Sequence, residues 1–224
     1  MFAKTPTHVR EDFDRIALAS PDSGDHGGAH QDFLLSLLPS PCRRALEVGC
    51  GTGAFARALA RRAEHVLGID LSPNMIRVAR EKSDGVANLE FEIADVLERM
   101  FPAEHFDCVV AIAALHHVPW EAALLRLRDA LASPGVLLVL DLFAPASPGD
   151  YAAHLISYPY AFWRRVRAGT VIPEPRVRKL WSEHGSRDTY PRLGELRSLC
   201  RKHLPGARIE RRLPWRFSLV WRKP

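Results

Sequence analysis

The chain has 224 residues, of which 47% are hydrophobic and 25% are charged, and its formal net charge is +5. This length predicts one domain with a sizeable core, and the ordinary composition excludes wholesale disorder and fibrous repeats. The charge is unevenly distributed, because residues 1–150 hold 14 Lys and Arg against 21 Asp and Glu whereas residues 151–224 hold 17 against 5. Because the last third is basic, the protein could bind an acidic partner, and nucleic acid is one such candidate.

No transmembrane span is expected, because the longest apolar run, residues 109–115, falls far short of the about 20 residues that cross a bilayer. Residues 1–12 are too polar for the apolar stretch of a signal peptide. The four cysteines are scattered without a Cys-x-x-Cys pair, which is typical of reduced thiols. Together these features predict a cytoplasmic protein.

Strands and helices are expected to alternate between residues 45 and 142. We expect strands at 45–48, 65–70, 89–93, 107–115 and 136–142, and helices at 54–63, from 73 onward and at 120–131. Ser72 and Pro73 form a favourable helix start, as an N-cap followed by a proline at the first helical position. Apart from Asp107 and Asp141, the strands at 107–115 and 136–142 are continuous apolar runs, as are strands covered on both faces. This pattern predicts an α/β fold with a doubly wound, mostly parallel sheet.

The ends of the chain are expected to complete a single domain. Residues 1–40 form an N-terminal cap segment, 43–142 the ligand-binding core, 143–190 a helical lid or insertion, and 191–224 a closing helix and strand pair. The strand pair follows from alternation of aromatic and other residues around Pro214, which also predicts a solvated face for Arg216 and Arg222. The lid carries Tyr158 and Tyr160, which could line an organic substrate.

A glycine-rich turn follows the first expected strand, in the string Glu47-Val48-Gly49-Cys50-Gly51-Thr52-Gly53. Such a turn brings the backbone close to a ligand, and the spacing also fits a dinucleotide fingerprint. Asp70 ends the second strand, where a carboxylate can accept hydrogen bonds from both ribose hydroxyls, and Asp95 ends the third, near an adenine. Acids at three strand ends suit a cationic ligand with an amino group, a ribose and an adenine better than a pyrophosphate.

These strings, with Gly68 to Met75, Ala94-Asp95 and Phe106 to His117, resemble the class I S-adenosylmethionine-dependent methyltransferases, small-molecule members of the ubiquinone and menaquinone biosynthesis type above all. The resemblance covers about residues 43–142. It implies a Rossmann-like sheet of seven strands with the last one reversed, and S-adenosylmethionine as the cofactor. The residues that it places at the cofactor are Glu47, Gly49 and Gly51 at the methionine part, Gly53 in the same turn, Asp70 at the ribose, Leu71 and Met75 at the adenosine, Asp95 and Val96 at the adenine, and Ala111 and Ile112 on the sulfonium side.

The acceptor side of the site is less defined by the sequence. His116 and His117 follow the strand at 107–115, where either could act as a general base or simply pack. His26 and His30 belong to a segment that could fold over the site. Their spacing could also match two metal ligands, but no third ligand is apparent, so no metal is predicted.

Three interpretations of the function remain open on the sequence alone. The first is methyl transfer to a small organic acceptor at O, N, S or C, and a charged acceptor would be anionic because the lid is basic. The second is an RNA-directed methyltransferase that uses the basic last third. The third is a non-catalytic protein that only binds S-adenosylmethionine, or an NAD-dependent dehydrogenase. A nucleic-acid substrate is disfavoured because the Asn/Asp-Pro-Pro-aromatic string of base-amine methylation is absent from the sequence.

Overall fold

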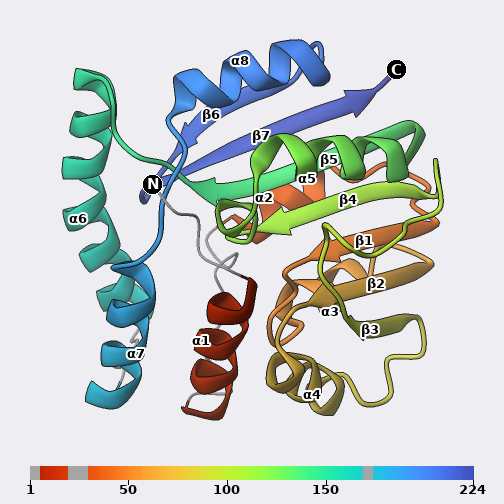
Figure 1. Ribbon diagram of the computed structural model, residues 1–224, viewed down its shortest axis with the longest axis horizontal. Helices are drawn as coiled ribbons and strands as arrows, with labels where there is room; N and C mark the ends of the chain where they lie inside the picture. The colour runs from red at the N-terminus through yellow and green to blue at the C-terminus, as the bar shows by residue number, and fades with distance from the viewer. Residues whose placement is uncertain (1–5, 20–29, 169–173) are drawn as a thin grey trace.

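The computed structural model describes residues 6–19, 30–168 and 174–224, and within them seven strands form one sheet in the order β3-β2-β1-β4-β5-β7-β6 (Figure 1). The strands are β1 (Arg44–Val48), β2 (His65–Asp70), β3 (Leu89–Ile93), β4 (Phe106–Ile112), β5 (Leu131–Leu142), β6 (Arg208–Arg212) and β7 (Arg216–Lys223). Strands β1 to β5 pair in parallel, and β7 runs antiparallel to both β5 and β6. The predicted mostly parallel sheet with a reversed last strand is confirmed.

Helices cover both faces of the sheet, as in a doubly wound fold. One face packs against α5 (Trp120–Ala130) and α8 (Leu193–His203), and the other against α2 (Gln31–Ser36), α3 (Ala54–Leu59) and α4 (Pro73–Lys82). Successive strand residues serve opposite cores, because side chains alternate along a strand: Leu46 packs toward α5, and Ala45 packs toward α3. The central strands are therefore apolar at nearly every position.

Strand β4 is shorter than the sequence predicts. It ends at Ile112 rather than at residue 115, because Ala113 has a φ of +50° and turns the chain into a short 3-10 helix, η1 (Leu115–His117). The apolar run continues past the strand because Leu115 is fully buried within the turn. This turn sets the two histidines of η1 at the carboxyl edge of the sheet.

The segment expected to form a lid folds into α6 (Pro148–Ala168) and α7 (Pro175–Gly185), which stand at one side of the sheet (Figure 1). Helix α6 starts with reciprocal hydrogen bonds between Ser147 and Asp150, and Asp150 also accepts a hydrogen bond from Arg211 Nε at 2.6 Å. Helix α1 (Pro6–Ala19) lies between α4 and α7 and packs against both. None of the helices in the described part of the chain combines the length and hydrophobicity that crossing a bilayer requires.

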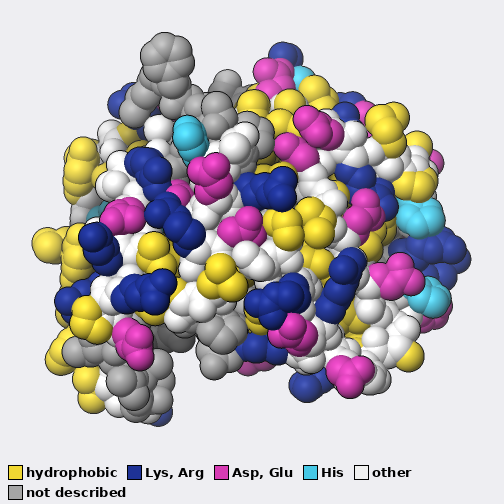
Figure 2. Space-filling view, turned by 60° about the horizontal axis from the view of Figure 1, so that its bottom comes forward, with side chains coloured by type: hydrophobic (Ala, Val, Ile, Leu, Met, Phe, Trp, Pro, Cys, Tyr) yellow, Lys and Arg dark blue, Asp and Glu magenta, His cyan; other side chains and the backbone are white. Residues whose placement is uncertain are grey.

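The last strand follows the predicted alternation at its aromatic positions but not at Arg216. Phe217, Leu219 and Trp221 are buried, and Arg222 is exposed as expected. The prediction of a solvated Arg216 is wrong, because its Nη1 atom is shielded from solvent and has no hydrogen-bond partner in the structure. Burial lowers the pKa of Arg216, and the charge of Asp141 opposes that shift. On the visible face of the molecule, basic and acidic side chains are interspersed (Figure 2).

Candidate active site

The glycine-rich turn between β1 and α3 is built from left-handed backbone. Gly49, Gly51 and Gly53 have φ values of +69°, +53° and +75°, which favour glycine. A Cβ at Gly49 would lie 2.5 Å from Ala114 Cβ, so the missing side chain lets the turn after β4 approach the loop. A Cβ at Gly51 would meet no atom within 4 Å, so this part of the loop borders open space. Gly51 thus leaves room for a ligand against the backbone.

Asp70, at the end of β2, is tied to that loop. Its Oδ2 accepts a hydrogen bond from Gly51 N at 2.9 Å, and its Oδ1 accepts one from Ser72 N at 2.9 Å. Burial raises the pKa of Asp70, although these two hydrogen bonds act in the opposite direction. Each oxygen keeps a further acceptor site, so the carboxylate can receive hydroxyl groups from a ligand.

Glu47 is the least satisfied acid of the site. It is only 2% exposed, and its Oε2 atom has no hydrogen-bond partner in the structure. Burial raises the pKa of Glu47 well above its ordinary value, and the neighbouring Asp70 raises it further, while Arg57 opposes the shift. A buried carboxylate oxygen without a partner calls for a donor from elsewhere, and a ligand ammonium group would supply one.

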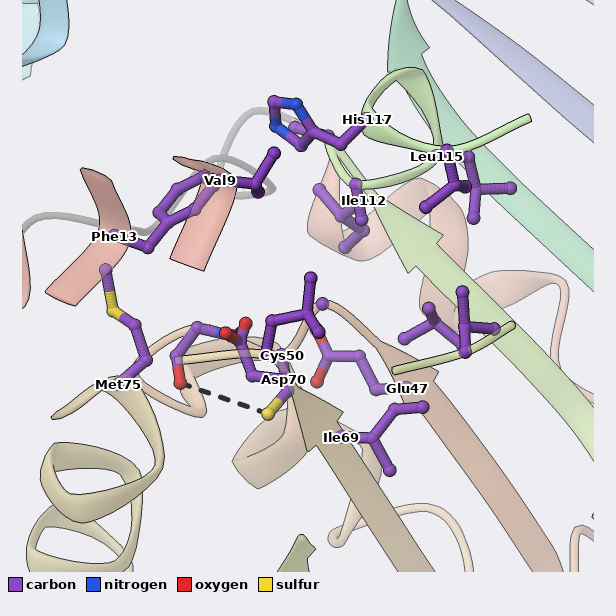
Figure 3. A pocket seen from close by; sticks show the side chains of 18 of the residues that line it. Val9, Phe13, Glu47, Cys50, Ile69, Asp70, Met75, Ile112, Leu115 and His117 are labelled. Atoms are coloured by element: carbon purple, nitrogen blue, oxygen red, sulfur yellow. Dashed lines mark hydrogen bonds between the residues drawn. The ribbon is translucent and has the colours of Figure 1, made fainter. Parts of the chain in front are cut away.

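These acids open onto one pocket at the carboxyl edge of the sheet (Figure 3). Figure 3 shows Glu47, Cys50 and Asp70 along one side, with Val9, Phe13 and His117 facing them across the pocket. The sequence-predicted residues that line it are Glu47, Gly49, Gly51, Asp70, Leu71, Met75, Asp95, Val96, Ile112 and His117. Two predicted cofactor residues, Gly53 and Ala111, do not line it. A Cβ at Gly53 would lie 2.7 Å from the ring of Phe91, which gives that glycine a packing reason instead.

The lining residues that the sequence reasoning missed include three from helices outside the predicted cofactor-binding core. Val9 and Phe13 come from α1, and Trp181 comes from α7. The rings of Phe13 and Trp181 meet edge to face, with centroids 6.2 Å apart. The two helices therefore cover the pocket with an apolar wall.

The structure separates the two histidines of η1. His117 lines the pocket that contains Glu47 and Asp70 and also a second pocket, which shares Val118 with the first. His116 lines only the second pocket, and its Nδ1 atom lies 2.6 Å from Asp141 Oδ1. His117 is thus the histidine that borders both spaces.

Of the four residues proposed to line a substrate, the three that the structure describes are not brought to these pockets. His30 directly precedes α2 and lines neither one, and His26 lies outside the described residues. Tyr158 and Tyr160 belong to α6 and line neither pocket. Tyr158 is 65% exposed, and its ring meets that of Trp215 with centroids 5.1 Å apart.

The fold and this site define a class of enzymes that hold a nucleoside ligand at the carboxyl edge of an α/β sheet. Residues 45–135 match the family described as a methyltransferase domain. An uncharacterized methyltransferase of Mycobacterium bovis is 34% identical over 199 residues, which are 87% of this chain and 95% of that protein. A ubiquinone biosynthesis O-methyltransferase of Xanthomonas campestris is 31% identical over 58% of this chain and 54% of its own length.

Among solved structures, phosphoethanolamine N-methyltransferase 2 of Haemonchus contortus, crystallised with phosphomonomethylethanolamine and S-adenosylhomocysteine, is similar in fold. The two structures superpose with a TM-score of 0.66 and are 20% identical in sequence. The aligned region covers 92% of this chain and 47% of the Haemonchus contortus enzyme. The chain belongs to the methyltransferase family. It is an S-adenosylmethionine-dependent methyltransferase, and the unsatisfied carboxylate of Glu47 and the open backbone at Gly51 fit that cofactor.

Proposed function

We propose that the enzyme transfers the methyl group of S-adenosylmethionine to a small organic acceptor and releases S-adenosylhomocysteine. The observation that carries the cofactor's placement is Glu47, whose buried Oε2 has no partner and faces a pocket that also contains Asp70. In this placement Glu47 receives the cofactor ammonium group, and Asp70 receives the ribose hydroxyls. Met75, Asp95 and Val96 hold the adenine end, and Ile112 lies on the sulfonium side.

The acceptor is proposed to occupy the second pocket and to reach the methyl group past His117. This placement is supported by the two residues that line both pockets, His117 and Val118. The second pocket also contains Trp120 and Tyr190, whose rings offer an organic molecule apolar surface. A space bounded by side chains from η1 and from the segment after α7 suits a small molecule better than a folded RNA.

Methyl transfer from a sulfonium is an in-line displacement. A lone pair of the acceptor forms a bond to the methyl carbon, and the electron pair of the broken C–S bond goes to sulfur. Positioning and exclusion of water supply much of the rate in such a reaction. The apolar cover of Val9, Phe13 and Trp181 would exclude water, and His117 would contact the acceptor.

An anionic acceptor would need a basic side chain in the pocket walls, and the described residues of these walls offer almost none. Among the described residues that line the two pockets, the only such side chain is Arg187, and its Nη2 lies 2.7 and 2.8 Å from the carboxylate oxygens of Asp12. Arg176, Arg178 and Lys179 of α7 are exposed and line neither pocket. Another source of positive charge would be needed for an anionic acceptor.

The proposed function is tested by calorimetry with S-adenosylmethionine, with NAD as the comparison, followed by a screen of small hydroxylated, aminated and carboxylated acceptors for release of S-adenosylhomocysteine. Binding of the methyl donor but not NAD, with turnover of at least one small acceptor, is expected. RNA binding is measured in parallel against salt concentration, since phosphate contacts release counterions and give a steep salt dependence. Salt-dependent RNA binding with methyl transfer to RNA alone would replace the small-molecule proposal.

A further inference from the structure

A group of three ligand-type side chains lies where the two pockets meet. One ligand atom from each of His116, His117 and Asp188 falls within 4.8 Å of the others. His116 Nε2 is 3.9 Å from Asp188 Oδ2, and His117 Nδ1 is 3.6 Å from Asp188 Oδ1. The side chains of the three residues are only 4%, 7% and 3% exposed. Buried imidazole and carboxylate groups are thus gathered around a common centre.

The separations within this group suit a shared ion better than direct hydrogen bonds. Hydrogen bonds from nitrogen to oxygen are about 2.7–3.2 Å long, so 3.6 and 3.9 Å exceed that range. Two ligands bound tetrahedrally to one zinc ion, each at about 2.1 Å, lie about 3.4 Å apart. These two contacts end on different oxygens of Asp188, so contraction by roughly 0.2 to 0.5 Å at each would bring both to that spacing around a carboxylate that offers the ion both of its oxygens.

The surroundings orient the ligands as those of a metal site do. Asp141 is fully buried, its Oδ1 lies 2.6 Å from His116 Nδ1, and its Oδ2 accepts a hydrogen bond from His116 N at 3.1 Å. The Nε2 atom of His116 is thereby left to face Asp188. A carboxylate behind a histidine ligand fixes its tautomer and orientation and strengthens metal binding. Asp188 Oδ2 accepts a hydrogen bond from Tyr190 at 3.3 Å and also lies 3.5 Å from Nε2 of the buried His184, so an ion would share this carboxylate with both side chains.

We propose that His116, His117 and Asp188 bind one divalent transition-metal ion, of which Zn²⁺ is the reference. Two imidazoles and one carboxylate are ligands that Zn²⁺ and neighbouring first-row ions favour over Mg²⁺ or Ca²⁺. Three protein ligands leave a coordination position open, and the second pocket borders all three residues.

The open coordination position of the ion suggests which chemical class of acceptor the enzyme methylates. This step rests on the proposed function. An acceptor oxygen bound there would lose its proton to solvent more readily, because a metal ion lowers the pKa of a bound hydroxyl. The freed lone pair then forms the O–CH₃ bond while the C–S electron pair goes to sulfur, so no oxidant or reductant is consumed. The ion would also supply the positive charge that the described pocket walls lack. The acceptor is accordingly a hydroxyl or enol compound.

The binding step is tested on untagged full-length protein treated with a chelator and then dialysed. Titration with ZnCl₂ alone by calorimetry, together with elemental analysis after gel filtration, gives affinity and stoichiometry without any turnover. Wild type is expected to bind one Zn²⁺ per chain. Asp188→Asn and His116→Gln should weaken binding at least tenfold, and Asp141→Asn by about 10-fold, as loss of a supporting carboxylate does. His65→Gln, at an exposed position where β2 begins, is the matched control and should bind as wild type does.

Fold and cofactor binding are measured on every variant by circular dichroism and by calorimetry with S-adenosylmethionine. A variant that still folds and binds the cofactor but not Zn²⁺ supports the metal site. Should Asp188→Asn fail to fold, His116→Gln and His117→Gln decide. Substoichiometric Zn²⁺ in wild type, or equal Zn²⁺ affinity in the ligand variants and in His65→Gln, overturns the proposal and leaves an ordinary histidine–aspartate network. Either result leaves the test of the proposed function intact, because that test measures cofactor binding and methyl transfer.

Discussion

Replacement of Glu47 by Gln removes an ionisable carboxyl group from the cofactor pocket while almost keeping the side-chain shape. In the free enzyme this carboxyl group is 2% exposed, its Oε2 has no partner, and burial raises its pKa well above the ordinary value of 4.5. A carboxyl whose pKa rises on folding binds more protons in the folded state than in the unfolded state. Its contribution therefore makes stability decline as the pH rises above 4.5. At neutral pH, Glu47→Gln is expected to increase the free energy of unfolding of the free enzyme.

Cofactor binding should change in the opposite direction. A hydrogen bond between the carboxylate and the cofactor ammonium is worth about 1.5–3 kcal/mol, so its loss should raise Kd by about 10- to 150-fold. The ammonium group favours the ionised carboxylate. The affinity of the wild type should therefore rise with pH through the pKa of Glu47, and the contribution of this group should disappear in the variant.

Both effects can be measured on the same preparations. Chemical denaturation of the free proteins gives the free energies of unfolding, and calorimetry with S-adenosylmethionine at several pH values gives Kd. Glu90→Gln, on an exposed position of β3 that does not line the cofactor pocket, serves as the control and should change neither quantity by much. An unchanged Kd in Glu47→Gln would remove Glu47 from the ammonium site. A loss of stability in the free enzyme would refute the argument that its buried charge is costly.

Three further changes have defined outcomes. Asp70→Ala should raise the Kd for S-adenosylmethionine at least about tenfold in calorimetry, since a charged acceptor of the ribose hydroxyls is lost; an unchanged Kd would remove Asp70 from the ribose site. Gly49→Ala should lower the free energy of unfolding by at least about 2 kcal/mol in urea, because it strains a φ of +69° and sets a Cβ 2.5 Å from Ala114; a stability equal to wild type would contradict this. Asp150→Ala should cost about 1–2 kcal/mol at pH 7. Although burial opposes the shift, hydrogen bonds from Ser147 and Arg211 lower the pKa of Asp150 to about 2, so the wild-type advantage should fade in denaturation curves as the pH falls from 3.8 to 2.

The cofactor half of the site was predictable because its residues are close in the sequence to strand ends. Glycines in a turn after a buried strand, and acids at the next two strand ends, must lie at one edge once the strands are parallel. The end of β4 was harder to predict. Residues 113–115 are as apolar as the strand itself, and only the left-handed backbone of Ala113 and the burial of Leu115 within the turn separate the two.

The cover and the acceptor half depend on tertiary packing that local patterns do not encode. Phe13 precedes the first strand, and Trp181 and Asp188 follow the fifth in the chain, yet the packing of α1 and α7 brings them to the same edge. The sequence offered no metal set because the donors come from two segments, residues 116–117 and residue 188, without a motif that joins them. The prediction that Tyr158 and Tyr160 line a substrate failed for a related reason, since the packing of α6 brings neither side chain to the two pockets and leaves Tyr158 65% exposed.

The uneven charge of the chain has an intramolecular explanation. Within the described residues, basic groups of the last third pair with acids of the first 150 residues in at least four places: Arg187 with Asp12 at 2.7 Å, Arg211 with Asp150 at 2.6 Å, Lys223 with Glu104 at 3.1 Å, and Lys202 and His203 with Glu121 at 2.8 and 2.6 Å.

Asp12 and Asp150 are each only 3% exposed. Removing a cationic partner from such a buried carboxylate would destabilise the fold, so these basic side chains have a structural role. The exposed pairs with Glu121 contribute little energy but still spread the charge, and on the face shown in Figure 2 the two signs are interspersed. An RNA that recruited Arg187 and Arg211 would take one cationic partner from each of two buried carboxylates, leaving Asp12 with Arg15 and His184 and leaving Asp150 with backbone hydrogen bonds. The basic last third is therefore better explained as the complement of an acidic core than as a nucleic-acid footprint.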